Sequence, residues 1–367
     1  MMINYVDDSR PGITRKRRGR FWQYFGPDGQ RITDREEIER LNAVGMPPAY
    51  ERCWFCPDPN GHMQAIGFDA KGRKQYRYHP GFREQQENLK YERLARFGRC
   101  LPLLRKKVEA DLQGKATDKD TVLAAVVRLI DETRMRIGNE EYAKENKSFG
   151  ATTLRNRHAK VTRGKLQISY VGKHGVKRTV TITDRNLTRI AKKTQDLPGQ
   201  HLFEYVQESG DICPVTSGDV NAYIKDAMGD DFTAKDFRTW GASVIAFEEM
   251  AKRLGESGKV RLKSMMEPVA EALGNTPAIS RKSYVHPALI EAAKDAGAIG
   301  SDKFPRATKF MSGAERGLID FLEALPEETA KVEEKVAKRA AAKGKSKAAV
   351  EAEVAQEAKA NLESAVG

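Results

Sequence analysis

The chain has 367 residues, enough for two or three domains, and a hydrophobic fraction of 40% that is sufficient to form real cores. Its formal net charge of +13 indicates an acidic partner, most commonly a nucleic-acid backbone. No apolar stretch is long enough to span a bilayer and no apolar signal region begins the chain, which argues against a membrane or secreted protein and predicts a cytoplasmic one with reduced thiols.

The first part of the chain has the pattern of a small, basic, β-rich unit. A basic run over residues 14–20 leads into an aromatic segment over residues 21–25 that is typical of a strand. Thr33 and Glu36 have the spacing of a capping box, which predicts a short helix ending near Leu41.

A β-hairpin and a helix complete this unit. The alternating segments 63–69 and 73–79 flank a three-residue turn and predict the hairpin. A helical stretch follows over residues 81–97, and the pattern changes at residues 98–103. We therefore expect an N-terminal β-rich domain over residues 1–100.

Two cysteines near the middle of this unit have the spacing of a zinc knuckle. Cys53 and Cys56 are separated by two residues, but neither a second cysteine pair nor a histidine pair follows at a usable distance. We expect half-buried strand cysteines rather than a metal or redox site.

The second part of the chain opens with a helix and a hairpin. Residues 120–134 place apolar side chains at helical spacing, which predicts one buried face. Residues 166–171 and 178–182 have β-like patterns around a tight connection, so Lys173 is expected at a hairpin tip. Arg136 follows the helix.

Several helix starts are marked by capping residues. Thr276 followed by Pro277 predicts a helix that carries Tyr284 about two turns in, and Pro287 ends or kinks it. Arg238 lies early in another predicted helix. The capping residues expected for this and two further helices are Thr233, Asp184, and either Ser217 or Asp219.

The last residues, 326–367, are dominated by Glu, Lys, Ala and Val and predict a charged tail that is either helical or disordered. The remaining residues, 101–325, are then the second domain. No phosphate-binding glycine loop is present, so no ATP site is predicted.

Tyr284, Arg136, Lys173 and Arg238 are the residue types that attack on a phosphodiester requires. A phenol with its ordinary pKa of about 10 is a poor nucleophile unless cations or a base lie near it. Arginines can neutralise the charge that develops on phosphorus, and a lysine can protonate the leaving oxygen. Asn275 adds an amide that can donate a hydrogen bond but cannot titrate.

These segments, read in order, resemble the type IB DNA topoisomerases, in particular their compact bacterial and poxvirus branch. Arg136 in MRIGNEEY, Lys173 in YVGKHGV and Arg238 in TAKDFRT look like the family's catalytic arginines and lysine. Asn275 stands where poxvirus and eukaryotic members carry a histidine, and Tyr284 is the implied nucleophile.

The resemblance implies an α+β fold, with a β-rich N-terminal domain and a mainly helical catalytic domain of the type IB topoisomerase and tyrosine recombinase kind. It implies a monomeric, nucleoid-associated enzyme that clamps double-stranded DNA and relaxes it through a 3′-phosphotyrosine, with neither ATP nor metal. The residues that would contact DNA are Lys71, Arg73, Gln75, Tyr76, Tyr78 and Tyr142.

Three alternatives stay open on the sequence. Tyr76 and Tyr78 share a strand face, which suits either DNA or a small aromatic core. A tyrosine recombinase has similar chemistry but usually a His-x-x-Arg box, and here Lys235 stands at the histidine position. A non-catalytic basic DNA-binding protein is the third reading. We expect His286, two residues beyond Tyr284, to be structural.

Overall fold

The computed structural model describes residues 3–162, 164–257, 260–294 and 304–325. The chain divides into two compact units, Met1–Glu92 and Arg93–Gly367. The boundary expected at residues 98–103 lies inside helix α3 (Leu94–Asp111), because its buried apolar side chains continue without a break into the second unit's core. The predicted tail, residues 326–367, lies outside the described residues.

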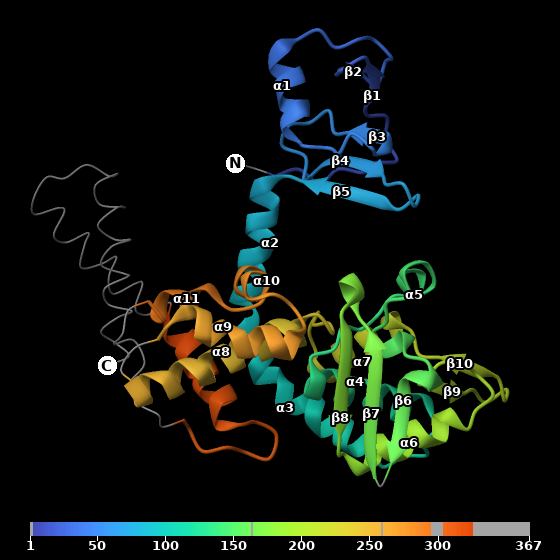
Figure 1. Ribbon diagram of the computed structural model, residues 1–367, viewed down its shortest axis with the longest axis vertical. Helices are drawn as coiled ribbons and strands as arrows, with labels where there is room; N and C mark the ends of the chain where they lie inside the picture. The colour runs from blue at the N-terminus through green and yellow to red at the C-terminus, as the bar shows by residue number, and fades with distance from the viewer. Residues whose placement is uncertain (1–2, 163, 258–259, 295–303, 326–367) are drawn as a thin grey trace, which may run out of the picture. The chain divides into compact units, whose positions relative to one another are not determined.

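The first unit contains a five-stranded antiparallel sheet in the order β2-β1-β3-β4-β5 (Figure 1). The predicted hairpin is β4–β5. The basic run is itself a strand, which pairs with the aromatic one. The strands are β1 (Ile13–Arg18), β2 (Phe21–Phe25), β3 (Glu51–Phe55), β4 (Met63–Phe68) and β5 (Lys74–Tyr78).

Helix α1 (Arg35–Ala43) packs on this sheet through Leu41, which is 1% exposed. Its cap is Asp34 rather than Thr33, because the Asp34 carboxylate is the group that accepts hydrogen bonds from the free N–H groups of the first turn. Helix α2 (Pro80–Glu92) ends the unit.

Cys53 in β3 and Cys56 just after it are both buried free thiols, more buried than expected. Burial raises the pKa of each thiol, which keeps both in the unreactive neutral form.

The second unit is mainly helical, with a three-stranded sheet β6-β7-β8 and a two-stranded ribbon β9–β10. The predicted hairpin around Lys173 is β7–β8. The strands of the second unit are β6 (Ala159–Thr162), β7 (Lys165–Val171), β8 (Lys177–Ile182), β9 (Glu204–Val206) and β10 (Ile212–Pro214). Besides α3, the helices bounded within the described residues are α4 (Lys119–Thr133), α5 (Glu140–Asn146), α6 (Arg185–Gln195), α7 (Ser217–Met228), α8 (Asp236–Ser257), α9 (Leu262–Leu273), α10 (Pro277–Ser283) and α11 (Pro287–Ala292).

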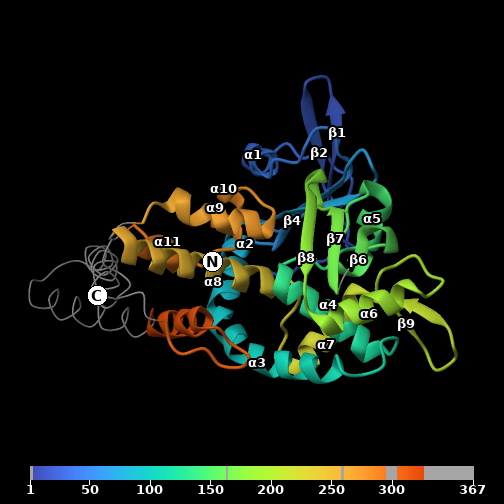
Figure 2. The ribbon, with the colours of Figure 1, turned by 60° about the horizontal axis from the view of Figure 1, so that its bottom comes forward.

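Helix α4 is the centre of this unit. It contacts α3, α6, α7 and α8, and Val122 through Val127 are all buried. The sequence predicted one buried face, whereas a helix with neighbours on several sides is apolar around most of its circumference. Helices α8 to α11 gather on one side of the unit and the strands β6 to β8 on the other (Figures 1 and 2).

One predicted cap is replaced by a neighbouring residue. Helix α7 is capped by Thr216, with Asp219 as the reciprocal partner of the capping box. Helix α8 begins at Asp236, whose carboxylate accepts hydrogen bonds from the N–H and hydroxyl of Thr233. Asp184 caps α6 and Thr276 caps α10, as predicted.

A last described helix, residues 313–325, is fastened to the unit through Glu315. Arg105 of α3 donates to Glu315 at 2.8 Å and to Asp131 of α4, and Trp240 of α8 donates to Glu315 at 3.2 Å.

The α+β class predicted from the sequence is confirmed. Among the described residues, no helix is long and apolar enough to cross a membrane.

Candidate active site

Arg136 lies on an extended segment between α4 and α5, and the backbone of that segment is held by a turn at residues 150–152. The N–H of Ala151 donates to the Arg136 carbonyl at 2.9 Å, and that of Thr152 donates to the Ile137 carbonyl at 2.8 Å. A Cβ atom at Gly150 would lie 2.5 Å from the Arg136 carbonyl oxygen, so this approach needs a glycine. The guanidinium is therefore carried on a fixed backbone.

Arg238 is the third residue of α8, and it is 4% exposed. One terminal nitrogen donates to the Arg134 carbonyl and the other donates to the Leu273 carbonyl at 3.0 Å. These bonds join three segments: the end of α4, the start of α8 and the C-terminus of α9. The buried Nε has no hydrogen-bond partner in the part of the chain that the structure describes.

Tyr284 lies directly after α10, as its C-terminal capping residue. The sequence predicted Tyr284 about two turns into this helix. Because α10 has only seven residues, that position falls just after its last turn. The ring lies beneath the Arg238 guanidinium, with 5.0 Å between Cζ and the ring centroid. His286 caps α11 through Nδ1, which accepts a hydrogen bond from the Ala288 N–H at 3.2 Å. This contact is structural, as the sequence led us to expect for His286.

The electrostatics around Tyr284 favour its phenolate. Burial by itself would raise the pKa of the phenol, but the positive charges of Arg238 and then Arg136 outweigh it and lower the pKa below its ordinary value of 10. Burial, followed by the charge of Arg136, lowers the pKa of Arg238 in turn. The phenol therefore releases its proton more readily than an ordinary tyrosine.

Asn275 connects Arg136 to the tyrosine segment. Its Oδ1 accepts a hydrogen bond from Arg136 Nη2 at 2.9 Å, which leaves Nδ2 as its donor. Nδ2 is buried and has no partner, like Nε of Arg238. Unpaired buried donors are costly, so these two donors suit an anionic partner such as a phosphate oxygen.

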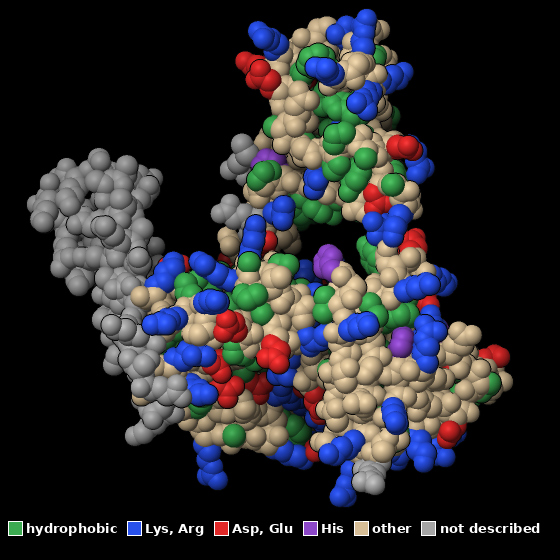
Figure 3. Space-filling model, viewed as in Figure 1, with side chains coloured by type: hydrophobic (Ala, Val, Ile, Leu, Met, Phe, Trp, Pro, Cys, Tyr) green, Lys and Arg blue, Asp and Glu red, His purple; other side chains and the backbone are tan. Residues whose placement is uncertain are grey.

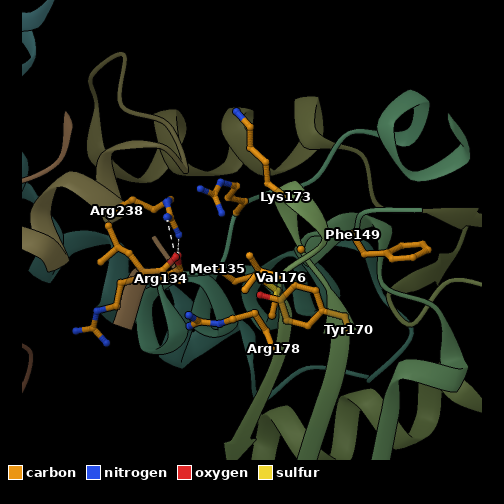
Figure 4. A pocket seen from close by; sticks show the side chains of 12 residues that line it. Arg134, Met135, Phe149, Tyr170, Lys173, Val176, Arg178 and Arg238 are labelled. Carbon is orange, nitrogen blue, oxygen red and sulfur yellow. Dashed lines mark hydrogen bonds between the residues drawn. The ribbon is translucent and has the colours of Figure 1, made fainter. Parts of the chain in front are cut away.

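Lys173 lies at the tip of the β7–β8 hairpin, as predicted, and is exposed. Within the described chain its ammonium has no ion pair. Figure 4 shows the side chain directed away from Arg178 and Tyr170, although Lys173 is among the residues that line the same small pocket. The Lys173 ammonium therefore forms no ion pair with any described carboxylate.

Arg178 and Tyr170 line this pocket and were not among the predicted site residues. Arg178 of β8 donates to the carbonyls of Glu271 and Ala272 at 2.8 Å each, and so holds the lysine hairpin to the C-terminus of α9. Burial raises the pKa of the Tyr170 phenol despite the nearby arginines, opposite to the shift at Tyr284. In sequence, both are ordinary strand residues.

The five predicted catalytic residues thus lie in one unit, and four of them are connected. Arg136, Arg238, Asn275 and Tyr284 form a single cluster, with Lys173 on the adjoining hairpin. The pocket shown in Figure 4 is lined by Arg134, Met135, Arg136, Phe149, Tyr170, Gly172, Lys173, Val176, Arg178, Arg238, Leu273 and Gly274.

The predicted DNA-contacting residues lie in both units. In the first unit, Tyr76 and Tyr78 on β5 stack at 5.9 Å and are 43% and 41% exposed. Gln75 on the opposite face of β5 donates to Asp69 at 3.1 Å, and Arg73 pairs with the same carboxylate. Both polar groups are therefore engaged within the protein, and Lys71 is exposed in the β4–β5 turn. In the second unit, Tyr142 of α5 is 51% exposed.

Comparison with known proteins covers most of the chain. The family model of the eukaryotic DNA topoisomerase I catalytic core matches residues 79–306, and that of the bacterial DNA topoisomerase IB N-terminal domain matches residues 21–69. DNA topoisomerase 1B of Acanthamoeba polyphaga mimivirus is 35% identical over 286 residues, which cover 75% of this chain and 85% of the relative.

A second relative and one solved structure are less similar. DNA topoisomerase 1B of vaccinia virus (strain Copenhagen) is 26% identical over 296 residues, covering 74% of this chain and 90% of its own. A solved XerH site-specific recombinase bound to a palindromic difH substrate matches 49% of this chain and 46% of its own, with 18% identity and a TM-score of 0.32, a likeness too weak to carry an argument.

Proposed function

We propose that this chain, which belongs to the type IB DNA topoisomerase family, relaxes supercoiled duplex DNA by cutting one strand and rejoining it. Tyr284 is the nucleophile in this proposal. Its phenolate oxygen attacks the scissile phosphorus, the bond from phosphorus to the 5′ oxygen breaks, and the 3′ end of the strand becomes a phosphotyrosyl ester.

The arginines and the lysine have different roles in this reaction. Arg238 and Arg136 face the phenol and would stabilise the negative charge that builds up on the phosphate oxygens in the transition state. Lys173, which lies at the hairpin tip and forms no ion pair with a described residue, would give its proton to the departing 5′ oxygen. Rejoining is the reverse reaction: the 5′ hydroxyl returns its proton and attacks the phosphotyrosyl ester.

Asn275 has a role that needs no proton transfer. Its Oδ1 accepts from Arg136, so the free Nδ2 is the group left to donate to a non-bridging phosphate oxygen. An amide does not titrate near neutral pH, so Asn275 would stabilise charge and orient Arg136 rather than act as an acid.

The observation that carries the proposal is the position of one phenol against a buried guanidinium: the Tyr284 ring centroid lies 5.0 Å from Cζ of Arg238, which is 4% exposed. The charges of Arg238 and Arg136 lower the pKa of Tyr284, whereas burial raises that of Tyr170. The energy of the broken phosphodiester is kept in the phosphotyrosyl ester, so the reaction as written requires no nucleotide hydrolysis.

The test is an incubation of the purified full chain with supercoiled plasmid of arbitrary sequence, in EDTA and without ATP. The proposal predicts a ladder of relaxed topoisomers. It also predicts a covalent protein–DNA adduct on a denaturing gel when the reaction is stopped with detergent. Relaxation confined to a plasmid with one particular site would indicate a recombinase, and binding without relaxation would indicate a non-catalytic protein.

The finer assignments are part of the same proposal. We infer a monomer of bacterial type that acts in the cytoplasm on nucleoid DNA, with Tyr76, Tyr78 and Tyr142 as exposed aromatic contacts. The engagement of Gln75 and Arg73 with Asp69 means that each must exchange a partner to contact DNA. Sedimentation of the free chain tests the monomer, and footprinting of Tyr76→Ala tests the contact.

A further inference from the structure

The hairpin β1–β2 extends beyond the sheet of the first unit. Strand β1 pairs with β3 only through Ile13 and Thr14, whereas it pairs with β2 along its length, as far as Arg18 with Phe21. Strand β2 is the outer strand of the sheet. Residues 15–23 therefore form a two-stranded ribbon, which we call the β1–β2 ribbon.

The base of this ribbon is fixed. Tyr24 is 2% exposed, and its hydroxyl donates to Asn42 at 2.9 Å. On the same face Arg15 stacks over Trp22, with Cζ 4.0 Å from the ring centroid, and donates to the Met46 carbonyl at 2.9 Å. A ribbon anchored in this way presents its outer part in a defined orientation.

The opposite face carries two cations on β1, Lys16 and Arg18, and two aromatic rings on β2, Phe21 and Phe25. Directly paired residues share a face, so Lys16 lies beside Gln23 and Arg18 beside Phe21. Lys16 Nζ is 5.1 Å from the ring centroid of Phe25, and Phe21 is 77% exposed. Figure 3 shows Lys and Arg side chains crowding this end of the unit.

The ribbon's charge is uncompensated. Lys16, Arg17, Arg18 and Arg20 have no carboxylate within ion-pair distance among the described residues. Other cations of this unit, such as Arg73, do form salt bridges. Four unpaired cations on a two-stranded ribbon create a local positive potential that attracts a polyanion.

We propose that the β1–β2 ribbon is a DNA-binding element that lies against the duplex and places its cations on backbone phosphates. The major groove of B-DNA admits a two-stranded ribbon, and an exposed ring such as Phe21 suits the apolar surface of thymine methyl groups there. The choice of duplex DNA as partner rests on the proposed function. Strand β1 precedes both matched family segments, and Phe21 is the first residue matched by the N-terminal family model, so the role of the ribbon is inferred from the charges and exposure of this chain's own residues.

The test compares two triple variants in a Tyr284→Phe background, which is expected to bind DNA without cutting it. One carries Lys16→Gln, Arg18→Gln and Arg20→Gln. The matched control carries Arg185→Gln, Lys192→Gln and Lys193→Gln, which neutralise three exposed cations of α6. Both lose three positive charges, so a difference between them reports position rather than net charge.

Binding of a labelled duplex is measured across a salt series. Each phosphate contact contributes about 0.9 to the slope of log K against log salt, so loss of the three ribbon contacts should lower the slope by as much as about 2.7. Arg18→Gln alone should lower it by about 0.9. The α6 variant should keep the parent slope, and a hydroxyl-radical footprint should shrink only for the ribbon variant.

Equal slopes for the ribbon variant and the parent would overturn the proposal, as would equal losses in both triple variants. A higher affinity of the ribbon for single-stranded RNA or for an acidic protein than for duplex DNA would also overturn it. Because the measurement uses a variant that cannot cleave, a failure of relaxation by the parent enzyme would refute the proposed function without changing this result.

Discussion

Replacement of Arg238 by alanine tests the most connected residue of the site. The change removes two hydrogen bonds, to the carbonyls of Arg134 and Leu273, and the guanidinium over the Tyr284 ring. Three properties should change together: the rate of cleavage, the stability of the fold and the pH dependence of the reaction.

The sizes of these changes follow from the contacts. Loss of one preorganised donor in an active site slows the chemical step by roughly 10²–10³-fold. Hydrogen bonds from charged groups contribute about 1.5–3 kcal/mol each, so removing two should lower the free energy of unfolding by roughly 3–6 kcal/mol. Arg238→Lys keeps a positive charge and a hydrogen-bond donor group, so it should lose less of the cleavage rate and less stability than Arg238→Ala.

The pH dependence has a definite sign. Arg238 is the strongest of the charges that lower the pKa of Tyr284 against the effect of burial. Without it that pKa rises, because burial and the weaker effect of Arg136 remain. The rate of single-turnover cleavage increases with pH as the phenolate forms, so its rising limb should move to higher pH in Arg238→Ala.

The assay is single-turnover cleavage of a labelled duplex from pH 6 to pH 10, with urea unfolding of the same samples. The matched control is Arg189→Ala, which removes another arginine that donates to helix-terminal carbonyls, those of Leu112 and Gly114. The control should lose stability without a shift of the pH profile. An Arg238→Ala profile that stays at the parent position would refute the assignment of Arg238 as the group that tunes Tyr284.

Three further changes have separate outcomes. Lys173→Ala should slow cleavage of an ordinary strand, and a 5′-bridging sulfur should restore the rate because a thiolate leaves without protonation; no rescue would mean that Lys173 acts only as a charge. Arg178→Ala, which frees the hairpin from α9, should slow cleavage by up to roughly 10²-fold through misplacement, while Arg189→Ala should leave the rate near the parent value. Truncation from Glu327 should leave relaxation unchanged at low salt and weaken it at higher salt, whereas loss of activity at low salt in a folded protein would make the tail part of the catalytic clamp.

The sequence predicted those features that depend on residues close together in the chain. Thr276 and Pro277 form a cap and a first helical residue whatever surrounds them, so the start of α10 was predictable. The hairpin around Lys173 follows from two alternating segments. Asp34 replaced Thr33 because the choice between adjacent cap candidates depends on which side chain reaches the free N–H groups.

The features that escaped prediction depend on distant segments. Arg178 contacts α9 more than ninety positions away, and nothing in the pattern of β8 indicates that contact. The all-round burial of α4 requires knowing that helices pack on several of its sides. The unpaired donors of Asn275 and Arg238 could be identified only after every neighbour had been placed.

The measurement that tests the central claim most directly is covalent trapping on a nicked duplex whose cleaved fragment diffuses away. Full-length protein, Tyr284→Phe and Tyr170→Phe are incubated with this labelled substrate and run on a denaturing gel, and the adduct is digested to locate the modified peptide. The account predicts an adduct through Tyr284 for the parent and for Tyr170→Phe, and none for Tyr284→Phe. An adduct that persists in Tyr284→Phe, or one that maps to Tyr170, would contradict it.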